Sequence, residues 1–164
     1  MEEIRLRPPV DEDWPAILCI AHESLSELSE VPDQTRWLNN RRAFPPDGVQ
    51  HHFVAVVADR VAGYACAEHR PRAVPGEFRL FVVVKPKDRQ SLGEHLLKQL
   101  ETQLPSLGAT HTWVLEYKAD ASFLAWWESH GFEYLKEFLI EDGVPAVELT
   151  RKVREVGALT PNPT

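Results

Sequence analysis

Residues 78–97 read FRLFVVVKPKDRQSLGEHLL, and the hydrophobic pattern within them changes from that of a strand to that of a helix. Residues 78–84 are rich in β-branched and aromatic side chains, which is typical of a strand. Pro86 ends that strand, and leucines then recur with helical spacing at Leu92, Leu96, Leu100 and Leu104. Residues 110–117 predict the next strand. A strand, a helix and a strand in this order predict two parallel strands joined by a right-handed crossover.

The flanking segments predict antiparallel neighbours for this pair. Residues 52–58 and 61–68 form one predicted hairpin, residues 132–140 and 144–152 form another, and residues 4–7 add a short strand. Helical spacing appears from residue 15 to 28, from 33 to 41 and from 121 to 130. We therefore expect an α/β (α+β) fold with a mixed, mostly antiparallel sheet of about seven strands and helices on both faces.

Length and composition narrow the function classes. The 164 residues suit a single domain, and the net charge of −7 argues against a general nucleic-acid binder. Cys19 and Cys66 belong to no paired motif, so we expect reduced thiols and no metal site. The charged N-terminus has no apolar signal segment, and no apolar stretch approaches the length of a membrane span. These features predict a cytoplasmic protein that binds neither nucleic acid nor membranes.

The segment after the central strand resembles the signature of the GCN5-related N-acetyltransferase (GNAT) family. That signature is a strand ending V-x-P, a loop Q/R-x-x-G-x-G/A and a helix, and residues 88–93 stand at the loop. Gly93 matches the last glycine, whereas Asp88 replaces the usual Gln or Arg and Ser91 replaces the first glycine. The start of a helix presents free N–H groups that suit a pyrophosphate. The competing interpretation is an ordinary strand-turn-helix with a capping serine.

A second match lies in residues 120–132, which resemble the family's N-x-x-A-x-x-x-Y-x-x-x-G-F segment. Gly131 and Phe132 agree with it, but Asp120 replaces Asn and Trp127 replaces Tyr. The resemblance covers about residues 4–152. It implies a GNAT-like domain at 1–152, with its central parallel pair splayed apart, and we expect a flexible tail at 153–164.

The resemblance also implies an enzyme that transfers an acetyl group from acetyl-coenzyme A (acetyl-CoA) to an amine by direct attack. The acceptor would be a small-molecule or protein amine, and the protein a monomer or a homodimer. A catalytically degenerate acyl-CoA-binding or interaction module with the same fold is the alternative. The implied coenzyme-binding residues are Val82, Val84, Arg89, Gln90, Ser91, Leu92, Gly93, Glu94 and Asp120.

Several carboxylates are candidates for the catalytic base. Candidate bases are the strand residues Glu116 and Glu77, with Glu68 a further carboxylate. A one-residue shift in strand register decides whether Glu116 faces the site, and the sequence favours solvent. Trp127 stands at the family's Tyr position, but its indole cannot supply a proton near neutral pH.

Overall fold

Seven strands and four α-helices follow one another along residues 2–154, the part of the chain that the computed structural model describes. The tail predicted at 153–164 lies outside these residues from position 155 onward. In chain order the elements are β1 (Ile4–Arg7), α1 (Trp14–Ser24), α2 (Thr35–Arg42), β2 (Val49–Val57), β3 (Arg60–His69), β4 (Glu77–Val83), α3 (Glu94–Gln103), β5 (His111–Tyr117), α4 (Ala121–Ser129), β6 (Glu133–Leu139) and β7 (Pro145–Lys152).

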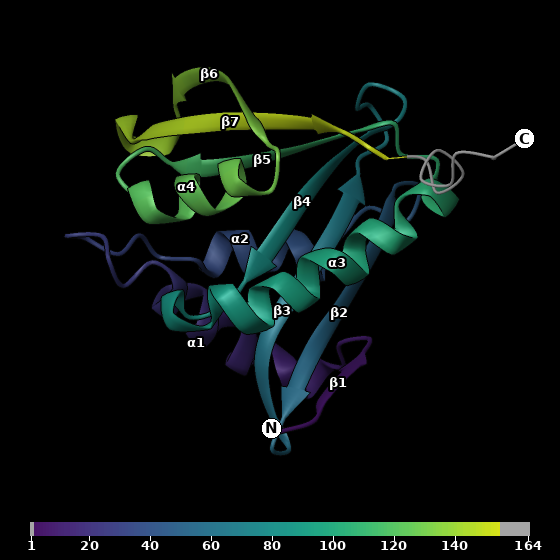
Figure 1. Cartoon of the computed structure of the whole chain (residues 1–164), viewed down its shortest axis with the longest axis vertical. Helices are drawn as coiled ribbons and strands as arrows, with labels where there is room; N and C mark the ends of the chain where they lie inside the picture. The colour runs from purple at the N-terminus through teal and green to yellow at the C-terminus, as the bar shows by residue number, and fades with distance from the viewer. Residues whose placement is uncertain (1, 155–164) are drawn as a thin grey trace, which may run out of the picture.

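The strands form one mixed sheet in the order β1-β2-β3-β4-β5-β7-β6 (Figure 1). β4 and β5 are parallel, and every other neighbouring pair is antiparallel. The fold class predicted from the sequence is therefore confirmed. The crossover from β4 to β5 is made by the helical segment that contains α3, as the change of hydrophobic pattern at Pro86 predicts.

β4 and β5 pair over only a short length and then separate. Their register joins Glu77 to His111, Phe78 to Thr112 and Arg79 to Trp113. Past Arg79, β4 remains paired with β3, and β5 remains paired with β7. In Figure 1 the two strands diverge from their paired ends toward α4. The splay expected for the central pair is present, and the edge of β4 that faces β5 has no strand partner there.

Each face of the sheet carries its own hydrophobic core. Leu80 and Val82 of β4 point into the core beneath α3 and α4. The alternate residues Phe81 and Val83 point into a second core that α1 and α2 cover. This alternation follows from the two-residue period of a strand. It also places neighbouring residues of β4 on opposite faces at the splay.

The segment after β4 differs from the loop predicted at residues 88–93. Lys85 is extended, and Pro86 starts a continuous helical segment of a 3₁₀ turn (Pro86–Asp88), a π-helical turn (Arg89–Gly93) and α3. Proline favours this start because its ring fixes φ near the helical value. The turn stays helical because Arg89 and Leu92 are buried against the protein. The predicted loop is therefore wrong.

Candidate functional site

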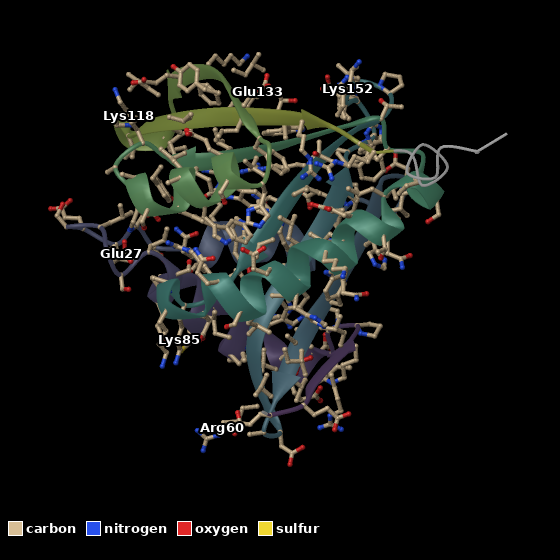
Figure 2. All side chains as sticks on the ribbon, in the orientation of Figure 1. Glu27, Arg60, Lys85, Lys118, Glu133 and Lys152 are labelled. Atoms are coloured by element: carbon tan, nitrogen blue, oxygen red, sulfur yellow. The ribbon has the colours of Figure 1, made fainter. Side chains whose placement is uncertain are left out.

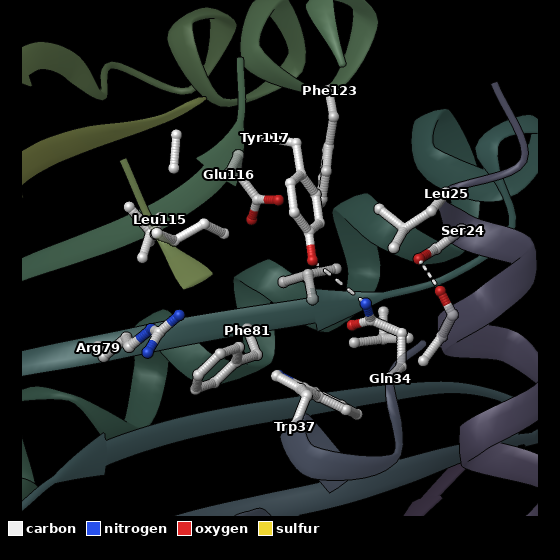
Figure 3. A pocket seen from close by; sticks show the side chains of 15 residues that line it. Ser24, Leu25, Gln34, Trp37, Arg79, Phe81, Leu115, Glu116, Tyr117 and Phe123 are labelled. Carbon is white, nitrogen blue, oxygen red and sulfur yellow. Dashed lines mark hydrogen bonds between the residues drawn. The ribbon is translucent and has the colours of Figure 1, made fainter. Parts of the chain in front are cut away.

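A cavity of about 110 Å³ lies where β4 and β5 separate (Figure 3). Strand residues form one wall, and residues from α1, α2 and the segment between them form the opposite wall. α4 and the β6–β7 connection close the remaining sides. The lining residues are Ala21, Ser24, Leu25, Gln34, Trp37, Arg79, Phe81, Val82, Val83, Leu115, Glu116, Tyr117, Phe123, Ile140 and Ala146.

Glu116 projects into this cavity from β5. The sequence favoured a solvent-facing orientation, and the structure shows this to be wrong: the carboxyl group lines the splay (Figure 3). Burial raises the pKa of the Glu116 carboxyl group to about 8. Asp120 also raises this pKa, whereas Arg79, Arg89 and the Trp127 indole N–H oppose the rise. A carboxyl group that titrates near neutral pH can exchange protons with a bound ligand.

Arg79 provides a cationic group in the same cavity. Its guanidinium packs over the rings of Phe81 and Trp113, at 4.5 and 5.0 Å from their centroids. Burial lowers the pKa of Arg79 to about 10, and repulsion from Arg41 contributes to this lowering. The buried Nε of Arg79 has no hydrogen-bond partner among residues 2–154.

Tyr117 and Gln34 form a polar bridge across the cavity. The Gln34 side-chain amide donates to the Tyr117 hydroxyl at 3.3 Å and to the Pro32 carbonyl at 3.1 Å. The Tyr117 hydroxyl accepts this bond, so its own hydrogen remains available to a ligand. The bridge joins β5 to the segment between α1 and α2 (Figure 3).

Trp127 is fully buried in an aromatic cluster on α4. Its ring packs edge-to-face against Trp126 and Phe132, with centroids 4.9 Å away in each case, and lies tilted against the Phe123 ring at 5.7 Å. Its indole N–H makes no well-formed hydrogen bond within residues 2–154. It nevertheless lowers the pKa of the Glu116 carboxyl group. Trp127 thus lies next to the cavity wall and does not line it.

The other two candidate bases lie elsewhere. Glu77 begins β4 and pairs with His111 of β5. Along β5, His111 lies five residues before Glu116. At about 3.3 Å per residue, that is roughly 17 Å. Glu68 is buried on β3, where Arg41 donates two hydrogen bonds to its carboxylate at 2.8 and 3.1 Å. The structure brings neither carboxylate into the cavity.

The start of the helical segment combines exposed polar groups with nearby lysines. Gln90 and Ser91 are exposed, and Lys85 and Lys87 line a surface depression beside them. Figure 2 shows Lys85 and Glu27 on this surface. Carboxylates from the end of α1 oppose the lysines, because Glu23 pairs with Lys85 at 3.1 Å. The two lysines and two glutamates that line this depression therefore balance in formal charge.

Side chains bridge the space between α3 and α4. A Cβ atom added at Gly93 would lie 3.3 Å from the Trp126 ring, so Trp126 rests directly on this glycine. Glu94 contacts His130, whose ring in turn packs on Trp126 with centroids 4.4 Å apart. Gly93 therefore serves close helix packing in this structure.

Arg89 and Asp120 contact each other in the interior. The Arg89 guanidinium lies 3.6 Å from the Asp120 carboxylate and donates to the Ser24 carbonyl at 2.9 Å. It also packs over the Phe123 ring at 4.1 Å. Asp120 caps α4 by accepting a hydrogen bond from the Phe123 N–H. These two residues join α1, α4 and the helical segment, and they present little surface to a ligand.

Sequence reasoning missed several residues that line the cavity: Arg79, Tyr117, Gln34, Trp37 and Phe81. One signal was available, since Arg79 is the only charged residue within the apolar stretch 78–84. A charged residue inside a strand of this kind needs a partner or a function. Gln34 and Trp37 line the cavity because of how α1 and α2 pack. The pattern of residues in the strands does not predict this packing.

Residues 2–154 contain neither a membrane-spanning helix nor a metal-binding cluster. No helix there is both long and apolar enough to cross a membrane. Within the same residues, no group of three or more histidine, cysteine, aspartate or glutamate side chains is arranged to hold a metal ion.

Comparisons with known proteins point to one family. A family model described as an acetyltransferase (GNAT) domain matches residues 22–153. A solved structure from Desulfovibrio desulfuricans, described as a GNAT-family acetyltransferase, is 19% identical with a TM-score of 0.73, over 93% of this chain and 100% of that chain. Among curated proteins, none matches the sequence.

Two further solved structures are similar over nearly their full length. A phosphinothricin acetyltransferase from Sinorhizobium meliloti, in complex with AcCoA, is 21% identical with a TM-score of 0.70, over 97% of this chain and 93% of that chain. The ribosomal-protein-S18-alanine N-acetyltransferase from Escherichia coli is 21% identical with a TM-score of 0.68, over 94% and 97% of the two chains. At these identities the likeness establishes the fold.

Proposed function

Because the chain belongs to the GNAT acetyltransferase domain family, we propose that it transfers an acetyl group from acetyl-CoA to an amine bound in the splay cavity. The observation that carries this proposal is Glu116, a carboxyl group with a pKa of about 8 between the separated strands. A base with this pKa is well matched to taking a proton from an amine near neutral pH.

The residues present fit acetyl-CoA at both ends. Past Arg79, the edge of β4 that faces β5 has backbone groups without a strand partner, and Val82 lines the cavity there. At the other end, Gln90 and Ser91 are exposed, and Lys87 lies nearby together with Lys85, which Glu23 already pairs. Arg89, Leu92, Gly93 and Asp120 are buried and would support this end through the backbone and packing.

The proposed reaction assigns a specific task to the chain's own residues. When bound, the coenzyme supplies an acetyl group activated as a thioester. Ionised Glu116 takes a proton from the acceptor's ammonium group, which frees the nitrogen lone pair. With acetyl-CoA bound, the nitrogen would bond to the acetyl carbon as the carbon–sulfur bond breaks, and the second ammonium proton would pass to the departing thiolate, giving the free thiol. A thiol with a pKa near 8.5 is a fair leaving group without a dedicated acid, which fits a tryptophan at position 127.

The test compares two glutamates on neighbouring strands. Glu116→Gln should lower kcat by about 10²- to 10⁴-fold, the usual contribution of a positioned base. Glu77→Gln makes the same chemical change at the paired end of β4, so its kcat should stay close to that of the unmodified protein. Release of free coenzyme thiol, measured with a panel of primary amines, gives both rates.

Two outcomes would contradict the proposal in different ways. A loss of rate in Glu77→Gln with none in Glu116→Gln would mean that the base is misassigned. Coenzyme binding without transfer to any amine would favour the degenerate binding module, which the replacement of the family's Tyr by Trp127 already brings into consideration.

A further inference from the structure

Arg79 carries a charge with which no side chain of residues 2–154 forms an ion pair, although the carboxyl groups of Glu68 and Glu116 act on it at longer range. The guanidinium is largely enclosed by aromatic rings. The nearby Arg41 is different, because Glu68 accepts two hydrogen bonds from it. A buried guanidinium is stabilised when an anion accepts its hydrogen bonds. Arg79 therefore has unused capacity for an anionic group.

Arg79 lines two cavities. On the side away from the splay, Arg79 lines a second cavity of about 130 Å³ together with Glu68 and Glu77. Arg70 lines this cavity too, and Glu68 is already paired with Arg41 and Arg70. On the splay side, the cavity wall next to Arg79 is formed by Phe81 and Leu115, and the guanidinium points inward (Figure 3). An anionic group bound in the splay cavity would therefore lie beside this guanidinium.

Further polar groups lie on the same cavity. The Tyr117 hydroxyl keeps a hydrogen to donate, since it already accepts from Gln34. Glu116, the proposed base, faces the same space from β5. The cavity thus presents a guanidinium and a hydroxyl donor for an anion, and a carboxyl group for an amine.

We infer that the acceptor is a small amine that also carries a carboxylate, as a free amino acid does, with Arg79 binding the carboxylate and Glu116 facing the amine. This inference rests on the proposed acetyl transfer. A planar guanidinium matches a carboxylate through two parallel hydrogen bonds, which favours this anion. The cavity volume of about 110 Å³ favours small acceptors such as glycine or alanine. For comparison, an apolar cavity of about 150 Å³ holds benzene.

The experiment compares an acceptor that carries this charge with one that lacks it. Acetyl transfer is measured with glycine and with glycinamide, in which a neutral amide replaces the carboxylate. We expect kcat/KM for glycine to exceed that for glycinamide by about 10- to 100-fold, the range for charge-assisted hydrogen bonds. Arg79→Met should remove this preference. Arg79→Lys keeps the charge but loses the planar fork, so it should retain part of the preference.

A matched control and a third acceptor complete the design. Arg72 is exposed and does not line the splay cavity, so Arg72→Met, which removes the same charge, should keep the full preference for glycine. A peptide with an N-terminal glycine and an amidated C-terminus tests recognition of protein amines. Equal rates for this peptide and glycine would overturn the inference, as would a preference that survives in both Arg79 variants.

A binding measurement separates this inference from the proposed reaction. N-acetylglycine carries the carboxylate and has no free amine, so thermal stabilisation by it does not depend on turnover. Stabilisation that is lost in Arg79→Met, together with no transfer to any amine, would support the carboxylate site and reject the proposed reaction. Transfer to carboxylate-free amines without any effect of N-acetylglycine would support the reaction and overturn the inference.

Discussion

At the scale of single residues, the cavity depends on two charged side chains inside strands. Arg79 lies on the face of β4 that α1 and α2 cover, the same face as Phe81 and Val83. Glu116 lies on β5, on the same face as Val114, which is buried in the core on the other side of the sheet. The two charges therefore come from opposite faces of the sheet and can approach one cavity only because the strands separate. A continuous sheet would have kept them apart.

Trp127 gives a test of how the cavity wall controls Glu116. The pKa of the Glu116 carboxyl group is about 8, and the indole N–H is one of the groups that lower it. Ionised Glu116 is the active base, so the rate should rise with pH toward this pKa and level off above it. Trp127→Phe removes the N–H, so the pKa should rise further. The midpoint of kcat against pH should then move to higher pH.

Trp127→Phe also removes packing contacts from the core. A matched substitution at the neighbouring Trp126 controls for this loss. Trp126→Phe shortens an adjacent buried ring on α4, and its indole N–H does not contribute to the Glu116 pKa. Both variants should lose about 1–3 kcal/mol in the free energy of unfolding, as expected for smaller core side chains. Only Trp127→Phe should move the pH midpoint. Equal midpoints in the two variants would show that Trp127 acts through packing alone.

At the scale of elements, the contact between α3 and α4 changes how coenzyme binding has to be tested. A glutamate at Gly93 would place both bulk and charge at the start of the helix. Because the Trp126 ring already lies close to Gly93, such a variant would disturb α4 as well. A loss of binding would then have two explanations. Ser91, exposed and two residues earlier on the same segment, gives a cleaner position.

Ser91→Glu should weaken coenzyme binding without destabilising the protein. Its carboxylate adds a negative charge beside the proposed pyrophosphate site and removes a hydroxyl donor. We expect Kd for acetyl-CoA, measured by calorimetry, to rise by about tenfold or more, with an unchanged melting temperature. Thr102→Glu introduces the same side chain at an exposed site near the other end of α3 and should bind normally. Equal affinities in both variants would place the pyrophosphate elsewhere.

At the scale of the whole molecule, the sequence predicted the fold better than the site. Strand and helix patterns act locally, and the change of pattern at Pro86 was enough to predict the parallel pair. The cavity depends on relations between distant segments, such as the bridge from Gln34 to Tyr117. The orientation of Glu116 could not be settled, since a shift of one residue in register reverses it. Family motifs pointed to Arg89 and Asp120, whose side chains the structure places in the interior.

From the split sheet we predict how coenzyme binding should change the stability of the whole molecule. Strands β1–β4 and β5–β7 form two groups that are joined through only three paired positions between β4 and β5. A ligand bound along the free edge of β4 would add contacts between the groups. Acetyl-CoA at 100 times its Kd should raise the free energy of unfolding by about 2.7 kcal/mol. For a chain of this size, that corresponds to roughly 5–10 °C in melting temperature.

Hydrogen exchange can locate the added stability within the sheet. If the coenzyme joins the two strand groups, amide exchange should slow most at the C-terminal end of β4 and along β5, where the strands separate. The outer strands β1 and β6 should change little, because they lie away from the splay. ATP at the same concentration and ionic strength controls for general polyanion binding. A shift of equal size with ATP, or protection confined to the α3 start, would mean that the ligand does not enter the splay.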